Sequence, residues 1–394
     1  MINPKMYELG SRRSVIREIF EYGKLRKQEV GEDKVYDFSI GNPSVEAPAA
    51  VAERVKELLE VNPSTLVHGY TSAQGDPKAR QAIADDLNNR FGTSFTGNNV
   101  YLTCGAAASL TISLRSVIDS ENQNVMVFAP FFTEYRVFIE SMGASIQVVP
   151  ASFPKLDLNL DAFENMINDK TVAVILNSPN NPTGVVYSEE QIMRLAEILN
   201  RKSAEFGHPI YIISDEPYRE ITYGCVPPFI TKYYANSLIC YSYSKGLSLP
   251  GERIGYILVP DVMPEWQNMY AAVCGAGRSL GFICAPTMFQ HVITKCAPLT
   301  SDLSKYAANR DLIYNGLTEL GYECVRPDGA FYLFVKCLED DANAFCMRAR
   351  KYDLLLVPSD DFGCPGYVRI AYCVSADTIK NSMPAFKALA ESYK

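Results

Sequence analysis

Residues 241–253 read Tyr-Ser-Tyr-Ser-Lys-Gly-Leu-Ser-Leu-Pro-Gly-Glu-Arg, and they place Lys245 among small hydroxyl side chains, eight residues before Arg253. A lysine that forms a Schiff base must lose its proton, so it requires a dry and partly cationic site. Hydroxyl groups and the forked guanidinium of an arginine are donors well suited to binding a phosphate. Taken alone, the segment is equally consistent with a solvated lysine and arginine in a serine-rich loop.

Two segments upstream of Lys245 add polar residues at the ends of buried strands. Asn-Ser-Pro-Asn-Asn-Pro-Thr-Gly (177–184) follows the apolar run 171–176, and Ile-Ile-Ser-Asp-Glu-Pro-Tyr (212–218) contains the end of a second run, 210–213. Strands and helices alternate through this part of the chain, which indicates a parallel sheet with helices on its faces. Ligands bind outside the carboxyl ends of such strands.

In this order, the three segments resemble the signature of the fold-type I pyridoxal-phosphate enzymes, specifically class I aminotransferases of the aspartate and aromatic kind. The resemblance extends from Gly41-Asn42-Pro43 to Gly366-Tyr367-Val368-Arg369 and so covers nearly the whole chain. It implies an α/β fold: a large domain with a mostly parallel seven-stranded sheet and helices on both faces, plus a smaller α+β domain. We expect the large cofactor-binding domain at 42–290 and the small domain at 1–41 and 291–394.

Composition limits the classes of function. The chain has 394 residues, enough for two domains, and a net charge of −8, which disfavours a nucleic-acid surface. Its eleven cysteines form no C-x-x-C pair and it has only three histidines, so we expect no metal site. No run approaches the ~18 apolar residues of a membrane span. The N-terminal residues lack the apolar stretch of a signal peptide, so we expect a cytoplasmic protein with reduced thiols.

The resemblance implies that pyridoxal 5′-phosphate is the cofactor and that Lys245 binds it covalently. Asp215 matches the carboxylate that keeps the pyridine nitrogen protonated, so that the ring acts as an electron sink. Asn181 and Tyr218 match the two residues that hydrogen-bond to the phenolic oxygen of the ring. A cis Asn181–Pro182 bond is also expected from the family. Lys245 would further move a proton between the substrate and the cofactor.

The remaining cofactor contacts are implied in the same way. Phe132 matches the aromatic residue that stacks on the pyridine ring, with Phe131 as the competing assignment. Tyr70 stands five residues before Gly75, as in the family, where the tyrosine hydroxyl reaches the cofactor phosphate of the partner subunit; an ordinary half-buried tyrosine is the alternative. A homodimer is therefore expected. The phosphate would be held by a group of hydroxyl, guanidinium and backbone donors: Gly105, Ala106, Ala107, Ser242, Ser244, Arg253 and Tyr70 of the partner subunit.

Substrate recognition is assigned to fewer residues. Arg369 matches the arginine that clamps the α-carboxylate, and Gly41 and Asn181 match residues that lie against the substrate. Ala107 stands where one branch of aspartate aminotransferases has a lysine for the distal carboxylate, so that route is closed. Arg278 lies in the segment from which another branch supplies an arginine to the partner's site, although a surface or interface arginine is an equal alternative.

These assignments imply an aminotransferase that passes the amino group of an L-amino acid, aspartate or an aromatic one, to 2-oxoglutarate through a ping-pong pyridoxamine form. A carbon–sulfur β-lyase or an aminocyclopropane-carboxylate synthase would use the same lysine and arginine. A non-enzymatic effector domain of a transcription regulator is disfavoured, because residues 1–30 are too few for a winged-helix domain. Around this core of motifs we expect a helix at 12–30, a strand at 35–40 and a loop at 62–72.

Overall fold

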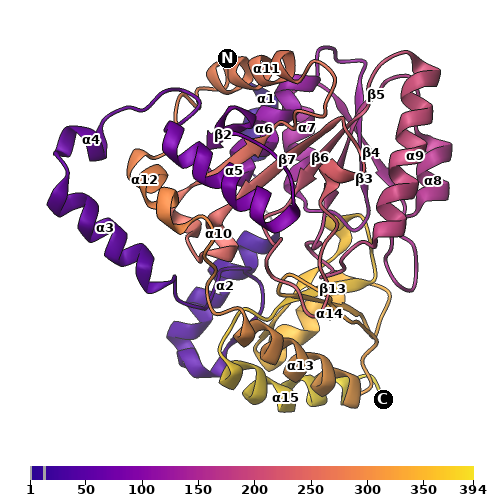
Figure 1. Ribbon diagram of the computed structural model, residues 1–394. Helices are drawn as coiled ribbons and strands as arrows, with labels where there is room; N and C mark the ends of the chain where they lie inside the picture. Colours follow the sequence, from indigo (N-terminus) through magenta and orange to yellow (C-terminus); the bar gives the residue numbers. More distant parts are fainter. Residues whose placement is uncertain (1, 12–14) are drawn as a thin grey trace.

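The structure is a computed structural model that describes residues 2–11 and 15–394. Its central element is a seven-stranded sheet of order β2-β8-β7-β6-β5-β3-β4 (Figure 1), in which only β8 runs antiparallel to its neighbours. This confirms the predicted mostly parallel sheet. The strands are β2 (Val100–Thr103), β3 (Asn124–Phe128), β4 (Ser145–Val149), β5 (Thr171–Asn177), β6 (Tyr211–Asp215), β7 (Ser237–Ser242) and β8 (Gly255–Leu258).

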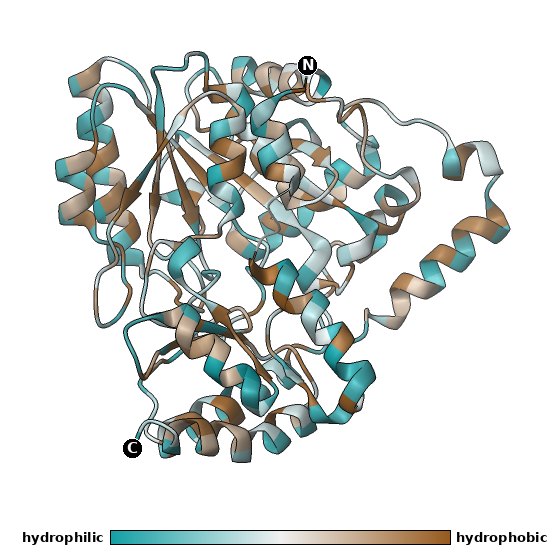
Figure 2. Ribbon diagram, turned by 180° about the vertical axis from the view of Figure 1, so that it is seen from behind, coloured by the Kyte–Doolittle hydropathy of each residue, from teal (hydrophilic) through white to brown (hydrophobic). Residues whose placement is uncertain are grey.

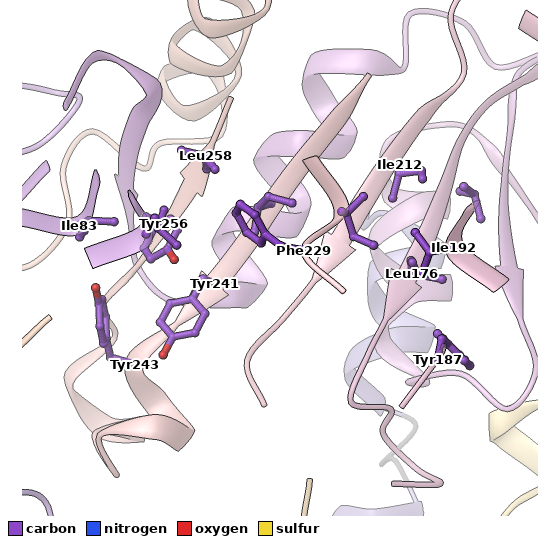
Figure 3. Packing of buried hydrophobic residues seen from close by; sticks show 14 of the residues in the cluster. Ile83, Leu176, Tyr187, Ile192, Ile212, Phe229, Tyr241, Tyr243, Tyr256 and Leu258 are labelled. Atoms are coloured by element: carbon purple, nitrogen blue, oxygen red, sulfur yellow. The ribbon is translucent and has the colours of Figure 1, made fainter. Parts of the chain in front are cut away.

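Helices cover both faces of this sheet, which is why its strands are nearly continuous apolar runs. On one face Leu176 and Ile212 pack with Ile192 of the covering helix α9 (Figure 3). Ile213 packs on the other face. One face is covered by α6 (Ala106–Val117), α7 (Glu134–Ser141) and α11 (Trp266–Ser279), and the other by α5 (Pro77–Phe91), α8 (Leu160–Met166), α9 (Glu189–Phe206) and α12 (Thr287–Cys296).

A second core lies at the C-terminal end of the chain, beneath the sheet in Figure 1, and is built around an antiparallel sheet of order β12-β13-β10-β9. Hydropathy colouring shows apolar strands inside both layers and polar helix faces outside (Figure 2). The predicted division at 41/42 and 290/291 stays a prediction. The elements are β9 (Cys324–Val325), β10 (Tyr332–Lys336), β11 (Leu354–Leu355), β12 (Val357–Pro358), β13 (Tyr367–Ala371), α13 (Ser304–Glu319), α14 (Ala342–Ala349) and α15 (Ala376–Glu391).

The N-terminal segment differs from expectation in two places. The expected strand at 35–40 is only β1 (Tyr36–Asp37), paired with β11, because the carbonyls of Ser39 and Gly41 accept side-chain hydrogen bonds in the site described below. The expected loop at 62–72 contains a short helix, α4 (Ser64–His68), whose Val67 is buried in the main core. The remaining helices are α1 (Pro4–Ser11), α2 (Val15–Val30), α3 (Ala49–Val61) and α10 (Tyr243–Gly246).

The predicted helix at 12–30 corresponds to α2, and residues 12–14 lie outside the described residues. All eleven cysteines are free thiols. Within residues 2–11 and 15–394, no helix has both the length and the apolar character that crossing a membrane requires.

Candidate functional site

The sequence motifs meet at the carboxyl ends of the central strands, where parallel α/β sheets bind ligands. Asn177 ends β5, Asp215 ends β6 and Ser242 ends β7, and these three strands are neighbours in the sheet. The short helix α10 begins directly after β7 and carries Lys245. The order of the strands therefore brings together residues that are up to 68 positions apart along the chain.

Lys245 is held against the N-terminal segment. Its Nζ donates a hydrogen bond of 2.6 Å to the carbonyl oxygen of Gly41. The pKa of Lys245 is lowered to about 8, chiefly by burial; the Cys373 thiol opposes this lowering, and the positive charges of Arg369 and Arg253 contribute to it to a lesser extent. A substantial fraction of the amine is thus neutral near physiological pH, which is the form that attacks a carbonyl carbon.

Asp215 is a buried carboxylate of which one oxygen accepts a hydrogen bond from another residue. Its Oδ2 accepts a hydrogen bond of 2.5 Å from the hydroxyl of Tyr135, while Oδ1 is buried and has no hydrogen-bond partner among the described residues. Burial raises the pKa of Asp215 to about 7, and the bond from Tyr135 opposes that rise. A buried acceptor of this kind fits a cationic N–H donor, and a protonated pyridine nitrogen is such a donor.

Sequence reasoning missed Tyr135, which lies on α7. Its ring is 2% exposed, and burial together with the neighbouring Asp215 raises the pKa of its hydroxyl well above the ordinary value, so it stays a donor. Tyr135 comes three residues after Phe132, on the first turn of a helix after the end of β3. The spacing from a strand end is the one sequence signal that could have indicated it.

Arg369 is a buried cation on β13. Its Nη1 donates to Asn181 Oδ1 at 3.1 Å and its Nη2 to the Ser39 carbonyl oxygen at 2.6 Å, but Nε has no partner. Among the described residues, no carboxylate forms an ion pair with it. A buried charge without a counter-ion is costly, so the guanidinium fits a ligand that brings a carboxylate.

The loop after β5 is fixed by hydrogen bonds from Asn177. The Asn177 side chain accepts from the Asn181 backbone N–H at 2.7 Å and donates to the Asp215 carbonyl oxygen at 2.8 Å. The expected cis bond between Asn181 and Pro182 is wrong: the cis peptide bond of this loop joins Ser178 and Pro179. The Asn177 and Arg369 contacts, rather than a cis Asn181–Pro182 bond, set the position of Asn181.

Four of the predicted phosphate residues lie together at the start of α6: Gly105, Ala106, Ala107 and Arg253. Gly105 has φ +84°, and a Cβ there would lie 2.8 Å from Nη2 of Arg253, so the glycine lets the guanidinium approach. No side chain caps α6, which leaves the N–H groups of Ala106 and Ala107 available at a positive helix end.

The two serines of the motif are coupled to each other. Ser242 Oγ caps α10 by accepting the Ser244 backbone N–H at 3.0 Å, and it donates to Ser244 Oγ at 2.5 Å. The pair is buried at the end of β7.

The structure separates the two aromatic candidates. Phe131 is 3% exposed and packs against Gly363, so it belongs to the core. Phe132 is half-buried and its ring meets Tyr135 edge-on at 5.6 Å between centroids. Phe132, beside the Tyr135–Asp215 pair, is therefore the better candidate for stacking on a ring bound there.

Two predicted residues are not brought to Lys245 within one chain. Tyr70 is 94% exposed, and Arg278 is exposed in the last turn of α11. Both would need a second subunit to reach a site of this kind.

The lowered pKa of Lys245 leads to a prediction for the protein without cofactor. The neutral fraction of an amine with a pKa near 8 rises about tenfold from pH 7 to 9 and then levels off, whereas that of an ordinary exposed lysine rises about a hundredfold. Trace acetylation followed by peptide mass spectrometry should give these two profiles. A Lys245 rate that still climbs steeply above pH 9.5 would contradict the assignment.

Comparisons with known proteins agree with this geometry. The family model for aminotransferase class I and II matches residues 33–386. A probable aspartate aminotransferase of Methanocaldococcus jannaschii is 27% identical over 386 residues, covering 96% of this chain and 97% of its own. An aromatic-amino-acid aminotransferase of Thermococcus litoralis is 24% identical, covering 100% and 97%. The crystal structure of an amino transferase from Eubacterium rectale matches with a TM-score of 0.98 and 56% identity, covering 100% of this chain and 99% of that one.

The matched residues span both cores and every motif that surrounds Lys245, Asp215 and Arg369. The sheet order and the arrangement of helices are those of the solved aminotransferase. The chain therefore belongs to the class I and II aminotransferases and has the fold-type I architecture.

Proposed function

We propose that this aminotransferase uses pyridoxal 5′-phosphate to transfer the amino group of an L-amino acid, aspartate or an aromatic one, to 2-oxoglutarate. One observation carries the proposal. Two buried polar atoms of the site, Asp215 Oδ1 and Arg369 Nε, have no partner among the described residues. Their chemistry is complementary to a protonated pyridine nitrogen and to a substrate carboxylate.

Pyridoxal phosphate, when bound, supplies an electron sink for the charge that develops at the substrate α-carbon. Asp215 would hold the proton on the ring nitrogen, and Arg369 would orient the substrate through its α-carboxylate. Lys245, neutral in part because its pKa is near 8, would bind the cofactor and later take the α-proton on Nζ. Asn181 and Tyr218 would donate to the ring oxygen.

The phosphate would be bound by Arg253, Ser242, Ser244 and the first-turn N–H groups of α6. These donors have the composition and position that an anion requires, at the positive end of a twelve-residue helix. A carbon–sulfur β-lyase or an aminocyclopropane-carboxylate synthase would need the same residues. The reaction type therefore has to be tested on product formation.

The test is a panel of amino donors with 2-oxoglutarate as acceptor. We expect glutamate to accumulate with wild-type protein, and Lys245→Ala to lose the near-visible absorbance of bound cofactor and about 10²–10⁴-fold or more of turnover. Lys232→Ala, an exposed lysine, is the matched control and should change neither. Pyruvate and ammonia formed without any keto acid would show a lyase instead.

A homodimer is part of the proposal, because Tyr70 is 94% exposed and no hydrogen bond joins it to the described phosphate residues of its own chain. In a dimer, the hydroxyl would reach the partner's phosphate site. We expect a molar mass in solution of twice the 43.8 kDa of the chain. A fully active monomer at micromolar concentration would refute this arrangement.

The donor preference depends on Arg278. It is exposed, and no described residue forms an ion pair with it, so its guanidinium is available to a distal carboxylate in a partner's site. In that case Arg278→Ala should lower kcat/KM for aspartate about 10–100-fold, because one charge-assisted hydrogen bond is lost. The kcat/KM for phenylalanine should stay nearly unchanged. An equal effect on both donors would remove Arg278 from the site and favour an aromatic donor.

A further inference from the structure

Tyr332 of β10 is a second residue that the sequence did not indicate. It contacts three residues of the site: Tyr218, Arg369 and Gly41. Its hydroxyl lies 2.8 Å from the hydroxyl of Tyr218, and the two rings meet nearly at right angles at 5.6 Å. The Arg369 guanidinium lies over its ring at 4.8 Å. Tyr332 is 2% exposed and Tyr218 is 5% exposed, so water does not separate these groups from each other.

The third contact explains a glycine in the N-terminal segment. A Cβ at Gly41 would lie 2.0 Å from the Tyr332 hydroxyl oxygen and 2.8 Å from its Cζ, so only glycine fits there. The carbonyl of the same Gly41 accepts the hydrogen bond from Lys245. Tyr332 thus packs against the backbone that holds the lysine, and it also contacts Tyr218, which belongs to the same buried cluster and follows the end of β6 in the chain.

The two hydroxyls share one hydrogen bond but carry two protons. Burial raises the pKa of Tyr332 to about 12 and that of Tyr218 well above its ordinary value, so both stay protonated at neutral pH. One hydroxyl donates to the other, and the acceptor keeps its own proton for a further bond. Either oxygen could be the donor on distance alone.

The residues around the two tyrosines decide which hydroxyl donates the hydrogen bond. The Tyr332 oxygen rests against Gly41 Cα, and no described residue offers it another acceptor. Tyr218 is the residue assigned to the ring oxygen in the proposed function, on which this step rests. Only if Tyr332 is the donor does Tyr218 keep a proton for that oxygen.

We propose that Tyr332 is a positioning residue: its hydroxyl donates to Tyr218 and so directs the Tyr218 proton toward the ring oxygen of the bound cofactor. A donor that itself accepts a hydrogen bond is polarised and binds its acceptor more strongly. The stronger bond stabilises negative charge on the ring oxygen. The protonation equilibrium of the bound chromophore should therefore respond to a side chain that does not touch the cofactor.

The experiment is a spectrophotometric pH titration of the holoenzyme in four forms: wild type, Tyr332→Phe, Tyr218→Phe and the double variant. Tyr332→Phe keeps the ring beside Arg369 and loses only the hydroxyl. We expect it to raise the pKa of the chromophore by about 0.3–1 unit, because the ring oxygen becomes more basic when the bond from Tyr218 weakens. Tyr218→Phe should raise it further, and the double variant should match Tyr218→Phe.

The matched control is Tyr322→Phe. The Tyr322 hydroxyl donates to the Phe386 carbonyl oxygen at 2.8 Å inside the second core, so its loss removes a buried hydrogen bond elsewhere. It should lower the melting temperature and leave the chromophore pKa unchanged. The proposal would be overturned if Tyr332→Phe left the chromophore pKa unchanged. It would also be overturned if Tyr332→Phe raised that pKa as much in the Tyr218→Phe background as in the wild type.

A measurement on the protein without cofactor separates this inference from the proposed function. If the two hydroxyls are bonded, the melting temperature of the double variant should fall by less than the sum of the two single losses. Additive losses would overturn the hydrogen bond itself. If the wild type bound no pyridoxal phosphate, the proposed function would be refuted, and the role of Tyr332 with it. The non-additive melting temperatures would still show that the two hydroxyls are hydrogen-bonded.

Discussion

The site depends on a single buried carboxylate at the end of the sheet. Asp215 is placed where burial alone would keep it neutral near pH 7, and Tyr135 supplies a donor to one of its oxygens. The hydrogen bond from Tyr135 offsets part of the cost of ionising Asp215, and a cation at the other oxygen would offset more of it. The position of Asp215 at the end of β6, between two neighbouring parallel strands, therefore selects the kind of group that can bind beside it.

The residue after Asp215 shows how the strand end is kept rigid. Glu216 points to the opposite side of the turn, where it accepts from Ser214 at 2.7 Å and pairs with the buried Arg219 at 2.6 Å. Arg219 also bonds to the Tyr256 hydroxyl at 2.8 Å and lies over the Tyr241 ring at 4.5 Å. The two adjacent acidic residues thus have different surroundings: Asp215 keeps one oxygen without a hydrogen-bond partner among the described residues, and Glu216 anchors the turn through Ser214 and Arg219.

The second physical constraint is that residues of the central sheet and of the second core come together beside Lys245. The N-terminal segment gives its Ser39 carbonyl to Arg369 and its Gly41 carbonyl to Lys245, and it could not do so as a regular strand. Arg369 of β13 donates a hydrogen bond to Asn181, which follows β5, and the Tyr332 hydroxyl of β10 is hydrogen-bonded to that of Tyr218, which follows β6. These two bonds end on residues that the proposed function assigns to cofactor or substrate, whereas others, such as the bond from the Phe131 N–H to the Phe362 carbonyl oxygen, do not.

The sequence by itself determined the family and the parallel sheet, and it predicted the roles of Lys245, Asp215 and Arg369, because these follow from strand-end motifs whose spacing is local. It did not reveal Tyr135 or Tyr332, since nothing in a tyrosine's neighbours along the chain indicates which distant oxygen its hydroxyl meets. The choice between Phe131 and Phe132, and the position of the Asn181 side chain, were likewise decided by contacts with Gly363 and Arg369. Those contacts join residues more than 180 positions apart, and only the folded chain brings them within bonding distance.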